Sequence, residues 1–271
     1  MSKKDNHRRD LIPLFDAFLT TADAAGKIEA YLVTNSNLPG PRGNLELADA
    51  FADLVEVYAG QASKKLWQLC VKMTAISAKE APVNDPREFV PFCGAVGLGT
   101  LGVAPEFFEP AMARFKTLAN DARWRMREGV PRGLQRLMVR RSQDVLTALA
   151  GWVAAGSLLE LRAVAATVAE PAPLKDRGVA RSALNLHRQI FERVLDNETR
   201  KSEEFRVLRQ ALGYTLSVVV QAIPAEGFEF MTQLVDSQDP DITWIVKENL
   251  KKKRLIKNFP DEVALIRQRL I

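Results

Sequence analysis

Apolar residues recur at spacings of three and four along most of the chain, which is the pattern of helices with one buried face. Leu11, Leu14, Phe15, Phe18 and Leu19 form the first example. The same pattern predicts helices over residues 45–59, 63–78, 106–118, 122–138, 142–155, 181–195, 203–222 and 242–255. Breaks rich in Pro, Gly, Asn and Asp lie at residues 35–43, 81–86, 171–173, 224–227 and 239–240. No stretch alternates as a strand between hairpin turns would. We therefore predict an all-α chain.

One segment of this helical pattern occurs twice. Residues 121–130 match residues 241–250, with Asp121 and Asp241, Trp124 and Trp244, and Arg127 and Lys247 at the same register. Glu128 and Glu248 follow at equal distances. Three units of about 40 residues fill the interval, and this is the length of a HEAT or armadillo unit. The repeat predicts helix pairs that stack on their neighbours because one pair cannot bury its apolar face alone.

Residues 80–257 resemble the HEAT-like repeat proteins of bacteria and archaea, through Pro86-Arg-Glu-Phe89, Trp124-Arg-Met-Arg-Glu128 and the run from Trp244 to Leu255. The resemblance implies a right-handed α-solenoid of antiparallel helix pairs. It also implies that Asp121 and Asp241 are helix N-caps and that Arg127 and Lys247 tie neighbouring units together. Residues 1–79 would form an N-terminal helical cap, continuous with repeats over residues 80–271 as one solenoid domain.

Composition narrows the class of protein. With 47% hydrophobic and 26% charged residues the chain is expected to fold. Its two cysteines, Cys70 and Cys93, are too few for a disulfide framework or a four-cysteine zinc site. They are expected to fill core space in a cytoplasmic protein. The longest uncharged stretches are shorter than the ~20 apolar residues that a membrane-spanning helix needs. We expect them to be buried core helices, with no membrane span in the chain: residues 89–105, 145–159 and 210–225.

Candidate catalytic groups are sparse, and we expect no metal or cofactor. His7 is expected in a mobile tail and His187 in a helix, with no Gly-x-Ser-x-Gly elbow to partner it. Gly97-Leu-Gly99-Thr-Leu-Gly102 matches the Gly-x-Gly-x-x-Gly motif of dinucleotide-binding proteins. Dinucleotide binding needs a strand before the glycines, and Pro91 interrupts the segment that would form this strand. The alternative, which we favour, is that these small residues let two helices pack closely.

The basic residues are concentrated in the C-terminal part of the chain. Residues 1–119 contain 13 Lys and Arg against 14 Asp and Glu, whereas residues 120–271 contain 25 against 19. Two stripes are candidates for contacting a phosphate backbone. The first is formed by Arg125, Arg132, Arg136 and Arg140, and the second by Lys247, Lys251 and Arg254. The alternatives are a solvated ridge and an internal Asp–Arg ladder.

Trp124 and Glu128, like Trp244 and Glu248, lie four residues apart on one helical face. This pairing is similar to that of HEAT-like DNA glycosylases for alkylated purines, although those enzymes use Asp rather than Glu. Its duplication favours a structural role over catalysis. We therefore predict a non-catalytic scaffold or adaptor that binds a protein or nucleic acid along the solenoid surface. The alternative is a DNA-binding protein or glycosylase that uses Trp124 and Glu128. The sequence makes no prediction of oligomeric state.

Overall fold

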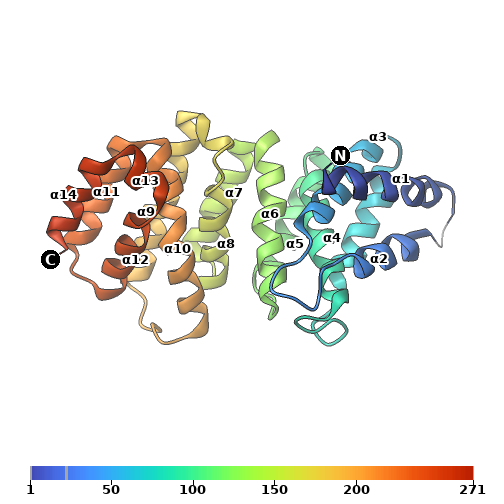
Figure 1. The fold of residues 1–271 in the computed structure, drawn as a ribbon, viewed down its shortest axis with the longest axis horizontal. Helices are drawn as coiled ribbons and strands as arrows, with labels where there is room; N and C mark the ends of the chain where they lie inside the picture. The colour runs from blue at the N-terminus through green and yellow to red at the C-terminus, as the bar shows by residue number, and fades with distance from the viewer. Residues whose placement is uncertain (1, 22–23, 271) are drawn as a thin grey trace. The chain divides into compact units, whose positions relative to one another are not determined.

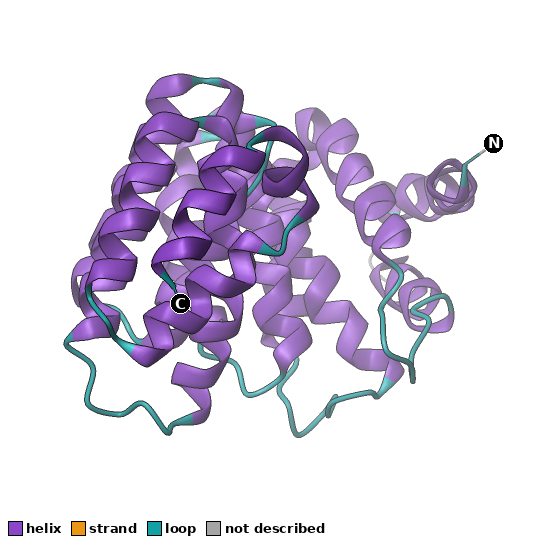
Figure 2. Ribbon diagram, turned by 60° about the vertical axis from the view of Figure 1, so that its left-hand side comes forward, coloured by secondary structure: helices purple, strands orange, loops and turns teal. Residues whose placement is uncertain are grey.

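The computed structural model describes residues 2–21 and 24–270 (Figure 1). These residues form fourteen α-helices and two 3-10 helices, and none of them forms a strand (Figure 2). The all-α prediction is thereby confirmed for the described residues. The chain divides into two compact units, Met1–Arg140 and Arg141–Ile271. The junction that the sequence suggested at residues 79 and 80 falls inside the first unit.

Six α-helices and one 3-10 helix make up the first unit. They are α1 (Lys3–Thr20), α2 (Ala24–Thr34), α3 (Leu45–Ala75), η1 (Pro86–Glu88), α4 (Phe89–Leu101), α5 (Pro105–Ala119) and α6 (Trp124–Arg140). Helix α4 is the centre of the unit, because it packs extensively against both α3 and α6 and all but one of its residues are buried. The predicted helices over residues 45–59 and 63–78 are both parts of α3, which is broken only at Ala62 by non-helical backbone angles.

Glycines bring α4 against α6. A Cβ atom added at Gly99 would lie 2.0 Å from the carbonyl oxygen of Gly133, so only glycine permits this approach of the two backbones. Gly97 faces Cys70 and Phe51 of α3 in the same way. The Gly-x-Gly-x-x-Gly match therefore lies in a buried helix rather than after a strand, and the close-packing interpretation is confirmed.

The second unit contains eight α-helices and one 3-10 helix. They are α7 (Ser142–Ala155), α8 (Leu158–Val168), η2 (Pro173–Lys175), α9 (Arg177–Leu195), α10 (Glu203–Ala222), α11 (Pro224–Asp236), α12 (Pro240–Leu250), α13 (Lys253–Asn258) and α14 (Pro260–Arg269). Helix α10 packs between α8 and α12, and α7 packs against α9. The break expected at residues 224–227 is the start of α11, because Pro224 occupies its first turn, where a proline needs no backbone donor.

The helix predicted over residues 242–255 is wrong in its second half. Helix α12 ends at Leu250, and α13 begins at Lys253 after the extended residue Lys252. Arg267 of α14 donates a hydrogen bond to the carbonyl oxygen of Leu250 at 2.8 Å, which satisfies one of the terminal carbonyls of α12. Lys247, Lys251 and Arg254 consequently do not lie on one continuous helix.

Two polar side chains are buried in the core of the second unit. Asn249 accepts a hydrogen bond from the N–H of Ser217 and donates to the carbonyl oxygens of Leu212 and Ile245, all at 2.8 Å. His187 contacts the carbonyl oxygen of Ala183 through Nδ1 and the hydroxyl of Thr215 through Nε2. Both side chains are fully buried and have partners, which makes them structural parts of the core.

Candidate functional site

The arginines of α6 are paired with acids of α3. Arg132 lies 2.5 Å from Asp49, Arg136 lies 2.8 Å from Asp53, and the exposed Arg140 lies 3.3 Å from Glu56. We call these three pairs the acid–arginine ladder. Burial raises the pKa of Asp53, but hydrogen bonds from Lys4 and Arg136 outweigh it and hold that pKa below its usual value. The predicted α6 stripe is therefore not an uncompensated basic surface, because its charge is offset within the first unit.

Arg125, the fourth member of the predicted stripe, is buried rather than exposed. Its side chain is 5% accessible, and it donates a hydrogen bond at 2.9 Å to Glu88, whose side chain is inaccessible. A second hydrogen bond reaches the carbonyl oxygen of Gly40. Arg125 therefore ties α6 to η1 and to the loop before α3, and it is not available to a phosphate.

Trp124 and Glu128 lie on the exposed side of α6. Trp124 is 42% exposed, and the guanidinium carbon of Arg125 lies over its ring, 4.3 Å from the ring centroid. Glu128 is exposed as well. Three surface pockets formed by described residues are lined by other side chains than these two.

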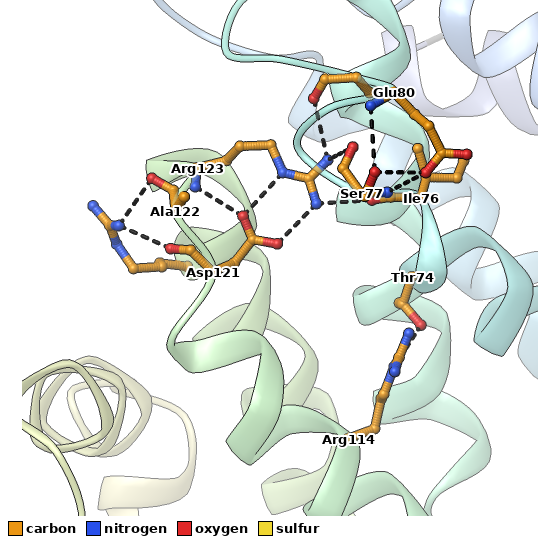
Figure 3. A network of polar contacts seen from close by, with 10 residues as sticks. Thr74, Ile76, Ser77, Glu80, Arg114, Asp121, Ala122 and Arg123 are labelled. Carbon is orange, nitrogen blue, oxygen red and sulfur yellow. Dashed lines mark hydrogen bonds and ion pairs between the residues drawn. The ribbon is translucent and has the colours of Figure 1, made fainter.

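Asp121 organises the start of α6 through a residue that the sequence interpretation missed. Its carboxylate accepts hydrogen bonds from the N–H, Nε and Nη2 of Arg123 at 2.8 to 2.9 Å (Figure 3). The buried guanidinium of Arg123 also donates to the carbonyl oxygens of Ile76, Ser77 and Ala81, in the segment that follows α3. The sequence contained a signal for this role, because Asp85 and Arg87 have the same spacing of two residues as Asp121 and Arg123. Asp85 and Arg87 also form the same carboxylate–guanidinium hydrogen bonds in the structure.

Arg127 contributes locally, by donating hydrogen bonds to the carbonyl oxygens of Asp121 and Ala122. At the second copy of the motif the N-cap is Asp239, not Asp241, because Asp239 accepts hydrogen bonds from the N–H groups of Asp241 and Ile242. The predicted N-cap role of Asp241 is thus wrong. Asp241 lies two residues after Asp239, as the second residue of α12, and pairs with Arg200 and Arg209.

Trp244 is placed differently from Trp124. It is the fifth residue of α12 and is partly buried, whereas Trp124 is the first residue of α6. The guanidinium of Arg209 lies 3.9 Å from the Trp244 ring centroid. A Cβ atom on Gly213 of α10 would approach the Trp244 ring to 3.2 Å and Cβ of Glu248 to 3.4 Å. The missing side chain at Gly213 therefore provides the space in which Trp244 and Glu248 rest against α10.

A surface pocket opens beside these two residues. It has a volume of about 520 Å³ and is lined by Trp244, Lys247, Glu248, Leu250, Lys251, Arg267 and Leu270. We call it the Trp244 pocket. Lys251 forms an ion pair with Glu248, and Lys247 makes no side-chain hydrogen bond or ion pair with any described residue. The pocket combines an aromatic ring, three cations and one carboxylate.

The uncompensated charge of the protein lies next to this pocket. Residues 247–257 contain six Lys and Arg against one Glu. The rest of the chain contains 32 Lys and Arg and 32 Asp and Glu, so this segment accounts for the whole net charge of +5. We call the six cations the basic surface: Lys247, Lys251, Lys252, Lys253, Arg254 and Lys257. Within the described residues only Lys251 of this set forms an ion pair. Figure 1 shows α12 and α13, which carry this surface, near the C-terminal end of the second unit.

The remaining candidate residues have structural roles. His7 does not lie in a mobile tail as expected, because it is in α1, where Tyr31 and Asn44 contact its two ring nitrogens at 3.0 Å. Burial lowers the pKa of His187 to about 4 and raises the pKa of Cys70 to about 12. Among the described residues no group of three or more His, Cys, Asp and Glu could hold a metal ion. In the same residues, no helix combines the length and apolar character needed to cross a membrane.

Comparison with known proteins adds little to this description. A scan against protein-family models finds no match, and a search of curated proteins finds no similar protein. Among solved structures, an engineered protein from the Northeast Structural Genomics Consortium is 14% identical over 89% of this chain and 97% of that chain, with a TM-score of 0.34. A similarity this low carries no argument about function.

Proposed function

We propose that this protein is a non-catalytic helical-repeat adaptor that binds nucleic acid through the basic surface of α12 and α13. The observation that carries the proposal is the location of the charge. Eleven residues hold the whole net charge of +5, and five of their six cations have no acidic partner among the described residues. A cluster of uncompensated cations attracts phosphate groups and releases the counterions condensed on them.

The packing of the second unit supports the repeat architecture in this proposal. Alternate helices α8, α10 and α12 pack side by side in chain order, and α7 packs against α9. These contacts support an arrangement in which consecutive helices alternate between two layers, as in an α-solenoid, where each pair contacts its neighbours. The register that was expected to relate Trp124 to Trp244 does not hold, so we base the proposal on the packing rather than on that match.

Residue type favours nucleic acid over a protein partner. The centres of protein–protein interfaces are depleted in lysine and enriched in aromatic residues and arginine. The basic surface contains five lysines and one arginine, and Ile256 is the exposed large hydrophobic residue within the same segment. Lysine ammonium groups bind phosphates as point charges without requiring one fixed geometry. This composition therefore favours a partner with a phosphate backbone over a protein partner.

The glycosylase alternative needs an acid beside an aromatic ring in a basic pocket. Glu248 and Trp244 meet that description better than Glu128 and Trp124, because they line a pocket with three cations. Incubation of the protein with methylated duplex DNA tests this alternative directly. We expect no released base, whereas release that is abolished by Glu248→Gln would replace the adaptor proposal with catalysis, since that variant removes the carboxylate that stabilises a cationic transition state.

Binding to a labelled oligonucleotide over a series of salt concentrations tests the proposed function. For a duplex, the logarithm of the association constant should fall with the logarithm of salt by ~0.9 per phosphate neutralised. The triple variant K252E/K253E/K257E should abolish binding. The control K27E/K64E/K79E changes three exposed lysines of the first unit that have no side-chain partner among the described residues, so it alters the net charge equally. Equal loss of binding in both variants would mean that binding depends only on net charge, and the proposal would fail.

A further inference from the structure

We infer that the Trp244 pocket holds one unpaired base of a single strand and that Glu248 selects a base with an exocyclic amino group. The inference rests on the proposed function, because it assumes that a nucleic acid lies on the basic surface. It adds two properties that the basic surface does not provide, namely a preference for single strands over duplexes and a preference among bases.

The indole ring of Trp244 is held in place from two sides. Arg209 lies over the ring at 3.9 Å, and Gly213 of α10 is close enough that an added Cβ there would lie 3.2 Å from a ring atom. Trp244 lines the pocket while Arg209 and Gly213 do not, so the pocket lies on a different side of the ring. A rigid aromatic side chain with one accessible side is suited to stack on a base, and every base has a face that can stack. A duplex keeps its bases stacked on each other and offers no such face.

The pocket opens directly onto the basic surface. Lys247 and Lys251 belong to both, and Arg267 adds a third cation at the pocket. A strand whose phosphates contact Lys247 and Lys251 would therefore have a nucleotide beside the pocket. The volume of about 520 Å³ is enough for one nucleoside, and the leucines Leu250 and Leu270 provide apolar contacts for a planar ring.

Glu248 is the one carboxylate in this lining, and it determines which base fits best. An ionised carboxylate only accepts hydrogen bonds, and its two oxygens have room for a donor in addition to Lys251. Cytosine presents an amino group at N4, where thymine and uracil present a carbonyl oxygen that a carboxylate repels. The pair cytosine and thymine is the sharpest comparison, because the two rings have the same size.

The experiment compares a short oligo(dC), an oligo(dT) of equal length and a duplex with an equal number of phosphates, each titrated into the wild-type protein. We expect oligo(dC) to bind at least about fivefold more tightly than oligo(dT), which corresponds to ~1 kcal/mol. Glu248→Gln should remove this preference, because an amide can both donate and accept. Trp244→Ala should weaken single-strand binding by about tenfold and leave duplex binding unchanged.

Matched variants separate the possible outcomes. Trp124→Ala removes a tryptophan that lies outside the Trp244 pocket, and it should change none of the three titrations. Trp244→Phe keeps an aromatic ring and should retain single-strand binding, which guards against loss of folding in Trp244→Ala. Equal binding of oligo(dC) and oligo(dT) that is unaffected by Glu248→Gln and Trp244→Ala would overturn this inference and leave the proposed function standing. No binding of any strand by the wild-type protein would overturn both.

Discussion

Gly99 of α4 and Gly133 of α6 meet backbone to backbone, at a distance where a Cβ atom on Gly99 would lie 2.0 Å from the Gly133 carbonyl oxygen. A methyl group there cannot be accommodated by a rotamer change, because the atom it meets belongs to the main chain. The two helices would have to separate, and α4 is the buried centre of the first unit.

Gly99→Ala should therefore destabilise the first unit by about 3 kcal/mol, the cost of overpacking a closed core. Gly151 of α7 provides the control, because an added Cβ there meets nothing within 4 Å. Gly151→Ala should stabilise the protein by ~0.5–1 kcal/mol by reducing the conformational freedom of the unfolded chain. Urea unfolding measures both changes, and equal effects of the two substitutions would contradict the close packing of α4 and α6.

His187 should make stability depend on pH. A carbonyl oxygen only accepts hydrogen bonds, so Nδ1 donates to Ala183 at 2.9 Å, and Nε2 is left to accept from the Thr215 hydroxyl at 3.1 Å. Burial lowers the pKa of His187 to about 4 in the folded protein, against ~6.5 in an unfolded chain.

Between these two pKa values the unfolded state binds the proton and the folded state does not, so stability falls as pH decreases from about 6.5 towards 4. The slope from this group should approach ~1.4 kcal/mol per pH unit. Chemical denaturation of the wild type and of His187→Gln at pH values between 7 and 5 measures it. The variant should lack this slope, and an unchanged slope would mean that His187 is not held neutral.

Loss of the buried ion pair Arg125–Glu88 should lower the free energy of unfolding more than loss of the exposed pair Arg140–Glu56. Glu88→Gln leaves the guanidinium of Arg125 buried without its carboxylate, which should cost about 3–5 kcal/mol. Glu56→Gln breaks a pair whose side chains are 55% and 64% accessible, and it should cost less than ~1 kcal/mol. The double variant E88L/R125M should be less destabilising than Glu88→Gln alone, because no unpaired charge remains buried. Thermal unfolding of the three variants checks the order.

Asn249 should prove important for the packing of α12 on α10. Asn249→Ala leaves the Ser217 N–H and the Leu212 carbonyl without this partner in a buried position, at a cost of about 1–3 kcal/mol. Asn249→Asp keeps an acceptor for Ser217 but directs a carboxylate at two carbonyl oxygens, so it should be more destabilising at neutral than at acidic pH. Hydrogen exchange at the Ser217 amide gives a local measure, and unchanged protection in Asn249→Ala would contradict this role.

Helical periodicity and the breaks between helices were visible in the sequence, because a buried face imprints its spacing on neighbouring residues. Even so, the limits of helices depended on contacts beyond the local pattern. The predicted helix over residues 242–255 stops at Leu250, where Arg267 arrives from α14. The role expected for Asp241 likewise belongs to Asp239, a difference of two residues that periodicity does not resolve.

The candidate site was harder to predict than the fold. Both basic stripes looked alike in sequence, yet one is neutralised and the other is not. Arg132 meets Asp49, which lies 83 residues earlier in the chain, and no local pattern relates the two positions. In contrast, Lys252, Lys253 and Lys257 have no acidic partner among the described residues. The Trp244 pocket depends in the same way on Gly213 of a different helix.

The sequence by itself determined the secondary structure class, the small residues that allow helices to approach and the concentration of net charge in residues 247–257, because these are properties of composition and short-range spacing. Only the tertiary structure decided which arginines are neutralised by acids, which tryptophan lines a pocket and which histidine is buried. The physical reason is that charge pairing, burial and enclosure depend on groups brought together by packing, and the residues that supply them are separated by tens of positions along the chain.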